Sequence, residues 1–199
     1  MINIKNINNS APYKRFEEEY LKASKKNQSN IQAVSISSYN KNINEVDARF
    51  VNLKYIIEDE WIFFSNYDSP KAIQFQSNKQ ITAIFYWSSI NVQIRIKANI
   101  EKSSKHISDI HFSNRGDKKN ALAISSQQSK FIKKYDEVVD NYKKVLNDKT
   151  LLKKRPINWG GYSFKPYYFE FWEGHESRIN KREIFEMWNN VWKHSFLQP

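Results

Sequence analysis

Short runs in which apolar and polar residues alternate constrain the fold of this chain more than any other feature. Successive side chains of an extended strand point to opposite faces, so this period of two predicts β-structure. The run NVQIRIKANIEK at 91–102 is the clearest, because Gln93, Arg95 and Lys97 share one face and apolar residues fill the other. Four further runs of this kind cover residues 31–38, 46–56, 60–66 and 80–89. We expect these five strands to form an antiparallel meander.

Helical periodicity flanks this strand region on its N-terminal side. Residues 12–26 begin with Pro12 and place Tyr13, Phe16 and Tyr20 on one stripe. A proline at the first helical position and an apolar stripe predict a short amphipathic helix. We expect it to cap the domain.

A second helical region follows the strands. Segment 103–148 predicts two short helices on either side of a break at 114–116, and a longer helix over 131–147. Strand-like runs then resume at 167–174, 177–182, 183–188 and 191–197. The fold class expected is mainly β with inserted helices (α+β), a small antiparallel β-barrel of eight or nine strands rather than a parallel α/β sheet. The expected division is an N-terminal helical segment at 1–29 and a barrel domain at 30–199, with the helical insert 103–148 and C-terminal strands 162–199.

Composition excludes several classes of protein. The chain has 199 residues, of which 40% are hydrophobic and 15% aromatic, enough apolar material for a packed core and too much for a disordered chain. It has no cysteine and only four scattered histidines, so we expect no disulfide and no metal site. The N-terminus lacks an apolar signal and no apolar run is long enough to span a membrane, which favours a cytoplasmic protein without membrane contact.

The formal charge of +11 calls for an anionic partner or a compositional explanation. No dense block of Lys and Arg is present, so nucleic acid is not favoured as a partner. Arg49 and Lys54 lie in one predicted strand and should leave from opposite faces. From the residues alone, both could be edge-strand charges that discourage aggregation. Ser69 before Pro70 predicts a helix start, which can hold an anion.

Several motifs in one order carry a family resemblance. They are ARFVNLK, FFSN followed by SPK, VQIRIKANIEK, HFSNR, ISSQQS, NWGGYSFKPYYFEFWEG and SRINKR. From about residue 30 to the C-terminus the chain resembles the pyridoxamine 5'-phosphate oxidase family of FMN flavoproteins. The resemblance implies a split β-barrel whose homodimer binds FMN in clefts between the subunits. It also implies an FMN-dependent oxidase that converts pyridoxamine or pyridoxine 5'-phosphate to pyridoxal 5'-phosphate with O2 as acceptor.

The same resemblance implies roles for individual residues. Arg49 and Lys71 would hold the FMN phosphate, Lys54 would reach the substrate phosphate beside the flavin, and Arg178 would act as the catalytic residue over the substrate ring. The implied cofactor-binding residues are Arg49, Lys54, Phe64, Ser65, Lys71, Gln93, Gln128, Ser129, Trp172 and Arg182. The implied substrate-binding residues are Lys54, His111, Arg115, Lys119, Arg178 and Asn180. Period two would place Arg178, Asn180 and Arg182 on one strand face.

Three positions depart from the family pattern and leave the substrate open. His111 and Lys119 stand where the family commonly has tyrosine and serine, and Asn180 replaces a histidine. One alternative is a related FMN-dependent oxidase of the same fold, of the phenazine-pathway type. A second, of another class, is a non-enzymatic barrel that binds flavin or nucleic acid. Core packing explains Trp172 as well as a site role does, and a histidine on a helix such as His111 is more often a surface or internally hydrogen-bonded residue than a ligand.

Overall fold

The strands predicted between residues 31 and 102 are present in the computed structural model, which describes all residues from 1 to 199. They are β2 (Ala33–Asn40), β3 (Glu45–Asn52), β4 (Tyr55–Ile57), β5 (Glu60–Asn66), β6 (Gln80–Trp87) and β7 (Val92–Lys102). The run predicted as one strand at 46–56 is two strands. The chain bends between them because Leu53 is fully buried and donates its N–H to Gln32, while the N–H of Lys54 bonds to Ile62.

The expected meander was wrong. The strands are ordered β1-β4-β5-β8-β7-β6-β2-β3, so β5 pairs with β8 and β6 pairs with β2 and β7. Helix α2 (Pro70–Ser77) follows β5 and carries the chain away from it before β6 begins. The short strand β1 (Asn3–Lys5), which the sequence did not indicate, pairs in parallel with β4. The other strand pairs are antiparallel, as expected.

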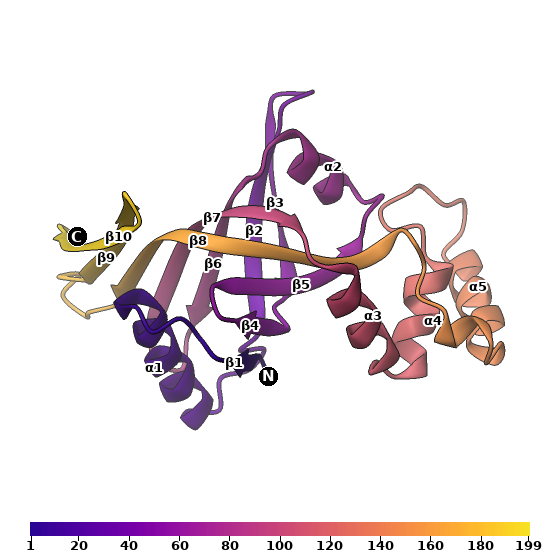
Figure 1. Ribbon diagram of the computed structural model, residues 1–199, viewed down its shortest axis with the longest axis horizontal. Helices are drawn as coiled ribbons and strands as arrows, with labels where there is room; N and C mark the ends of the chain where they lie inside the picture. The colour runs from indigo at the N-terminus through magenta and orange to yellow at the C-terminus, as the bar shows by residue number, and fades with distance from the viewer.

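Strand β8 (Trp159–Glu173) runs across the whole molecule (Figure 1). One of its edges pairs with β7, while the other pairs first with β5 and then with β9 (Lys181–Trp188). A register shift opposite Lys97 and Ala98 accompanies the change of partner. The strand begins at Trp159 rather than within the predicted segment 162–199. It therefore links the barrel to the C-terminal hairpin of β9 and β10 (Val191–Leu197).

The residues before β9 form a turn, so the predicted strand at 177–182 was wrong in its first part. Arg178 has a φ of 61°. The turn is closed by hydrogen bonds from the His175 N–H to Asn180 Oδ1 and from the Arg178 N–H to the His175 carbonyl. Of the three residues expected on one strand face, only Arg182 lies in a strand.

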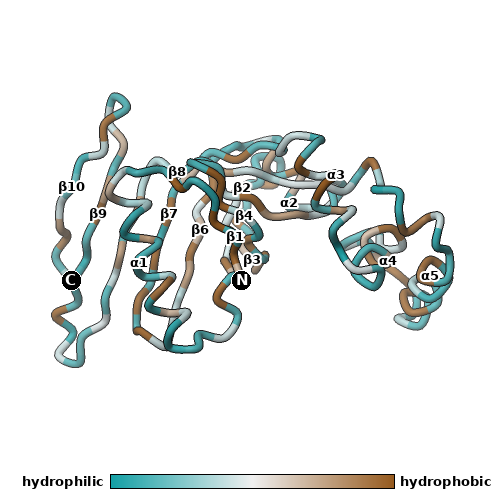
Figure 2. Tube along the Cα trace, turned by 60° about the horizontal axis from the view of Figure 1, so that its bottom comes forward, coloured by the Kyte–Doolittle hydropathy of each residue, from teal (hydrophilic) through white to brown (hydrophobic).

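The predicted helices are α1 (Ala11–Lys25), α3 (Lys105–Ser113), α4 (Asp117–Ser125) and α5 (Asp136–Asn147), followed by a short 3-10 turn at Leu151–Lys153. The helix expected over 131–147 begins only at Asp136. Asp136 and Glu137 form its first turn, where acidic side chains favour a helix N-terminus, and Phe131 is left fully exposed. Figure 2 shows α4 and α5 at one end of the molecule and the β9–β10 hairpin at the other.

Helix α1 belongs to the same hydrophobic core as the barrel. Phe16 is fully buried, with its ring 4.4 Å from that of Trp61 and 5.5 Å from that of Phe85. Tyr13 packs its ring 5.2 Å from that of Phe169 on β8. The segment 1–29 therefore completes the core of the barrel.

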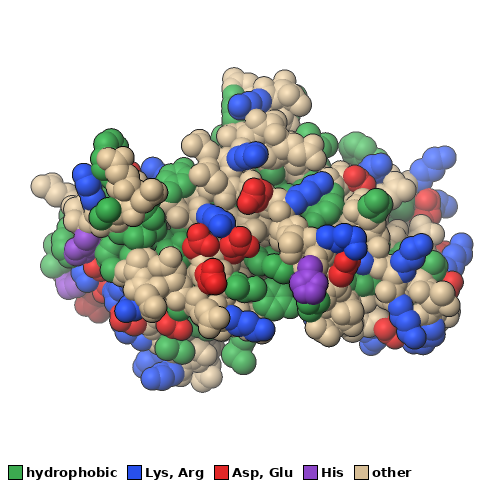
Figure 3. All heavy atoms as spheres, viewed as in Figure 1, with side chains coloured by type: hydrophobic (Ala, Val, Ile, Leu, Met, Phe, Trp, Pro, Cys, Tyr) green, Lys and Arg blue, Asp and Glu red, His purple; other side chains and the backbone are tan.

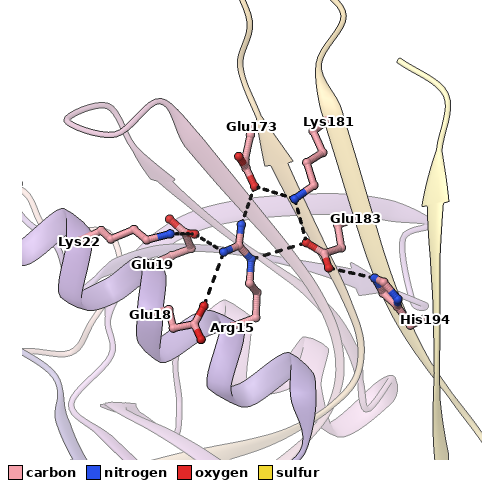
Figure 4. A network of polar contacts seen from close by, with 8 residues as sticks. All are labelled: Arg15, Glu18, Glu19, Lys22, Glu173, Lys181, Glu183 and His194. Carbon is pink, nitrogen blue, oxygen red and sulfur yellow. Dashed lines mark hydrogen bonds and ion pairs between the residues drawn. The ribbon is translucent and has the colours of Figure 1, made fainter.

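A polar network also joins α1 to the C-terminal strands (Figure 4). The guanidinium of Arg15 lies 2.5 Å from Glu173 of β8, 3.6 Å from Glu183 of β9 and 2.7 Å from Glu19 of its own helix. The Arg15 side chain is mostly buried, which reduces solvent screening of these pairs. Helix α1 is thus held both by apolar packing and by charge.

None of the helices is long and apolar enough to cross a membrane.

Candidate active site

A cavity of about 720 Å³ lies where β3, β5, the start of α2 and the turn between α3 and α4 meet. It brings together ten of the residues singled out in the sequence, namely Arg49, Lys54, Phe64, Ser65, Lys71, His111, Arg115, Lys119, Gln128 and Ser129. Arg49 and Lys54 were expected on opposite faces, but both line this cavity. The break between β3 and β4 places Lys54 outside the strand, so the alternation of a strand no longer applies to it.

The cavity is strongly cationic. Five of its lining residues are Lys or Arg, and Asp47 is its one carboxylate. Asp47 is paired with Arg49 at 2.5 Å. Cations gathered in a half-buried space repel one another, and each favours an anion as its neighbour. Lys and Arg are spread over several other elements on the face shown in Figure 3, where acidic residues lie among them.

Arg49 is already held by several acceptors. Its guanidinium donates to Ser38 Oγ at 2.6 Å and to Gln74 Oε1 at 2.7 Å, in addition to Asp47. The side chain is therefore fixed at the cavity wall by β2, β3 and α2. An anion that binds here would meet a guanidinium that is already oriented. It would compete with Asp47 for that guanidinium.

Lys71 lies in the first turn of α2 and is buried, with 6% of its surface exposed. Its Nζ donates to Ser65 Oγ and Ser69 Oγ, both at 3.3 Å. Burial, with the nearby Arg49, lowers the pKa of Lys71 to about 8. Ser69 precedes Pro70 as predicted, but its hydroxyl donates to the Asn66 carbonyl instead of capping the helix.

Arg115 and its neighbours form a second cationic group. The Arg115 guanidinium stacks on the ring of Trp159 at 4.4 Å and donates through Nη2 to the carbonyl of Lys119. Its other terminal nitrogen, Nη1, is buried and has no hydrogen-bond partner. Burial, Lys119 and Arg115 lower the pKa of Lys54. A buried donor without a partner and a lysine close to two cations both fit an anionic ligand.

His111 lies beside this group in an aromatic stack. Its ring lies 3.7 Å from that of Phe64 and nearly parallel to it, and Trp159 is parallel to both. The hydroxyl of Tyr55 is 2.8 Å from His111 Nδ1. Burial, followed by Arg115, Lys54 and Lys119, lowers the pKa of His111 to about 4. The imidazole is therefore neutral at physiological pH.

Sequence reasoning missed Tyr55 and Trp159 as members of this site. Trp159 stands inside the NWGG motif, so its place in that motif was a usable signal. Tyr55 had no signal, because it reads as one of several apolar residues in a strand.

The remaining predicted residues lie elsewhere. Trp172, Arg178 and Asn180 line a second cavity of about 420 Å³, which shares no residue with the first. Gln93 and Arg182 are the cross-strand neighbours of Trp172 on β7 and β9. Trp159 and Trp172 are separated along β8 by up to roughly 40 Å. One chain therefore does not bring its two groups of predicted residues together.

The C-terminal segment and most of the chain both match known proteins. Residues 159–199 match the family model described as the pyridoxine 5'-phosphate oxidase C-terminal dimerisation region. A pyridoxine/pyridoxamine 5'-phosphate oxidase of Legionella pneumophila (strain Lens) is 35% identical over 156 residues, which are 77% of this chain and 72% of the relative. One from Hydrogenovibrio crunogenus is 30% identical over 193 residues, 94% of this chain and 88% of the relative.

This chain belongs to the pyridoxine/pyridoxamine 5'-phosphate oxidase family. The predicted family is thereby confirmed. Two solved structures also share the fold of this family member. PhzG from Burkholderia lata 383, in complex with tetrahydrophenazine-1-carboxylic acid, has a TM-score of 0.88 at 21% identity and covers 96% of this chain and 93% of its own. A pyridoxamine 5'-phosphate oxidase-related, FMN binding protein from Nostoc punctiforme has a TM-score of 0.78 at 14% identity, over 96% and 99%. They confirm the predicted split-barrel fold.

Proposed function

We propose that this protein is an FMN-dependent oxidase that converts pyridoxamine or pyridoxine 5'-phosphate to pyridoxal 5'-phosphate, with O2 as electron acceptor. The observation that carries the proposal is the cationic cavity, in which the buried Nη1 of Arg115 has no partner. Lys54, Arg115 and Lys119 form no ion pair in this chain, so a phosphate dianion would give each of them a counter-charge.

The residues around Lys71 fit the phosphate of FMN. Arg49 offers a guanidinium, Lys71 an ammonium at the start of α2, and Ser65 a hydroxyl. A helix N-terminus with flanking cations is a favourable phosphate site. Gln128 lies 3.3 Å from Ser65 Oγ and would close this end of the cavity, while Phe64 would contact the ring system.

The second group of residues would be supplied by the partner in a homodimer. Residues 159–199, which match a dimerisation region, carry Trp172, Arg178, Asn180 and Arg182. Because β8 separates this group from the cationic cavity, a two-fold symmetric dimer offers a way to bring the two together. Each of the two sites would then use the cavity of one chain and the C-terminal residues of the other.

FMN, when bound, supplies the capacity to accept a hydride and to return the electrons to O2. The protein has to hold the substrate against it. Lys54, Arg115 and Lys119 would grip the substrate phosphate, and Arg178 would press the pyridine ring into place. For the alcohol substrate the balance is one O2 consumed and one H2O2 formed. The amine also consumes water and releases ammonia.

A related FMN-dependent oxidase acting on another anion is the second candidate. It is favoured by Lys119, which adds a third cation beside Lys54 and Arg115, and by His111 and Asn180. PhzG of Burkholderia lata, which shares the fold, was crystallised with a carboxylic acid. A carboxylate is an anion that this cavity would also accept.

Spectroscopy and a peroxide assay on the purified protein test the proposal. A flavin absorption spectrum, followed by peroxide release with pyridoxamine or pyridoxine 5'-phosphate, is the expected result. Release only with a tricyclic carboxylic acid would favour the second candidate. A bound flavin without turnover of either substrate would favour the non-enzymatic flavin-binding barrel. A protein that binds no FMN would overturn the cofactor assignment.

A further inference from the structure

Tyr55 contacts the candidate site through His111 without lining the cavity itself. Its hydroxyl has His111 Nδ1 as its one hydrogen-bond partner, at 2.8 Å, and the two rings meet edge to face at 5.4 Å. His111 does line the cavity. The Tyr55 contact occupies one ring nitrogen and leaves Nε2 as the nitrogen available to a ligand.

The protonation states of both groups follow from their surroundings. Burial raises the pKa of Tyr55, so its phenol keeps its proton at neutral pH. Burial and the three neighbouring cations keep His111 neutral. A neutral imidazole carries its proton on one nitrogen, and the hydrogen bond at the other nitrogen decides which.

A carboxylate or a doubly ionised phosphate ester can only accept hydrogen bonds, so a neutral His111 serves it only with the proton on Nε2. A donated O–H from Tyr55 to Nδ1 favours that tautomer. The opposite tautomer would require the Tyr55 hydroxyl to accept a hydrogen bond from Nδ1 and would present a lone pair to the anion. Stacking of the imidazole on Phe64 at 3.7 Å also prevents the ring from turning away.

We infer that Tyr55 is a positioning residue that holds His111 in the Nε2–H tautomer, as a neutral donor to the anionic group of the substrate. The inference rests on the proposed function for the identity of that substrate. It adds a determinant of substrate specificity that is not one of the positively charged residues of the cavity. A neutral donor strengthens the binding of an anion without adding to the repulsion among Lys54, Arg115 and Lys119.

Nitrogen-15 NMR of histidine-labelled, FMN-loaded protein tests the inference directly. The His111 signals are assigned by comparison with a His111→Gln variant and recorded at pH 7, with and without inorganic phosphate. The expected spectrum shows a protonated Nε2 and an unprotonated Nδ1 in both conditions. A proton on Nδ1 alone, or a doubly protonated imidazolium in the phosphate complex, would overturn the inference.

A Tyr55→Phe variant tests the positioning role by removing one oxygen atom. The expected result is a mixture of His111 tautomers and a KM for the phosphorylated substrate about five- to tenfold higher, which is the effect of one hydrogen bond, with kcat nearly unchanged. The affinity for inorganic phosphate should fall in parallel. An unchanged tautomer and an unchanged phosphate affinity would refute the role, and if the variant does not fold, the wild-type spectrum still decides.

Tyr67→Phe is the matched control. Tyr67 also donates from a part-buried hydroxyl, to the Gly161 carbonyl at 3.2 Å, but it does not line the cavity. It should leave the His111 tautomer and the phosphate affinity unchanged. The inference and the proposed function can fail separately, since phosphate binding and the tautomer are measured without turnover.

Discussion

At the residue scale, the candidate site is defined by positively charged side chains whose burial lowers the stability of the folded protein. Lys71 is the clearest, because its ammonium is buried beside Arg49 and has only two serine hydroxyls as partners. The cationic site residues were found through the family resemblance, since the residues alone favoured edge-strand charges as the explanation of Arg49 and Lys54. Tyr55 was missed because a strand pattern does not show which tyrosine will meet a histidine far along the chain.

Lys71→Met should raise the free energy of unfolding of the flavin-free protein. The pKa of Lys71 is about 8 in the folded state and 10.5 ordinarily, so the unfolded chain binds more protons between these values. The free energy of unfolding of the wild type should therefore rise as the pH rises from 8 to 10.5. Below pH 8 the full cost of burying the Lys71 charge is present. A gain of up to about 3 kcal/mol at pH 7 is expected in urea denaturation.

The same substitution should weaken FMN binding, because it removes a phosphate partner. Lys118→Met, at an exposed position on α4, is the control and should change neither quantity. A Lys71→Met protein that is less stable than wild type at pH 7 would contradict the assignment of a buried charge.

Arg178→Gly should separate catalysis from folding. The φ of 61° at Arg178 disfavours a side chain, so glycine should leave stability unchanged or improve it by about 1 kcal/mol. Loss of the guanidinium should lower kcat about a hundredfold while FMN affinity, measured by fluorescence titration, is retained. Asn190→Gly, at a φ of 62° in the β9–β10 turn, is the matched control. Equal losses of turnover and of FMN affinity would argue against the proposed role.

At the element scale, local pattern predicted which segments are strands and helices but not how they pair. The period of two identified β5 with its observed bounds, whereas the start of β8 was missed because Gly160 and Gly161 read as strand breakers. The structure shows instead why glycines occupy these two positions of β8. A Cβ at Gly160 would lie 2.2 Å from the Tyr67 hydroxyl, and one at Gly161 would lie 2.1 Å from Ser103 Oγ. Glycine lets β8 approach these neighbours without displacing the Tyr67 and Ser103 side chains.

Phe16→Ala tests whether α1 is an integral element. A fully buried phenylalanine in contact with Trp61 and Phe85 should cost about 3–5 kcal/mol in unfolding free energy when truncated. Leu21→Ala on the exposed face of the same helix should cost little. A loss below about 1 kcal/mol for Phe16→Ala, measured by chemical denaturation, would mean that α1 is dispensable for the core.

At the scale of the whole molecule, the strand order and the separation of the two groups of site residues arise from long-range pairing. No local pattern encodes that β5 meets β8, or that Trp159 and Trp172 end in different cavities. The sequence could identify most of the residues of the candidate site. The residue pattern alone could not show that one chain holds them apart, although the family resemblance implied FMN clefts between the subunits.

Mixing two defective variants tests the shared site. Arg115→Met impairs the cationic cavity and Arg178→Gly the C-terminal group, so each homodimer should be nearly inactive. After reversible dissociation and random mixing, about half of the dimers should be heterodimers, and one of the two sites in each heterodimer is intact. The mixture should therefore have about a quarter of the wild-type activity. Each variant mixed with itself is the control. No recovery in the mixture, with exchange of subunits verified by mass, would show that each site is built within one chain.

The packing of Tyr13 against Phe169 and Trp192 has a consequence for biosynthesis. The ribosome makes this first helix long before β8 and β10, which carry Phe169 and Trp192, and it makes β8, the partner of three other strands, near the end. Until then Tyr13 lacks both of these partners, although Phe16 can already contact Trp61 of β5 and Phe85 of β6. Folding of this protein should therefore be largely post-translational, and a chain that stalls before residue 159 should be a client for chaperones rather than a partly active enzyme.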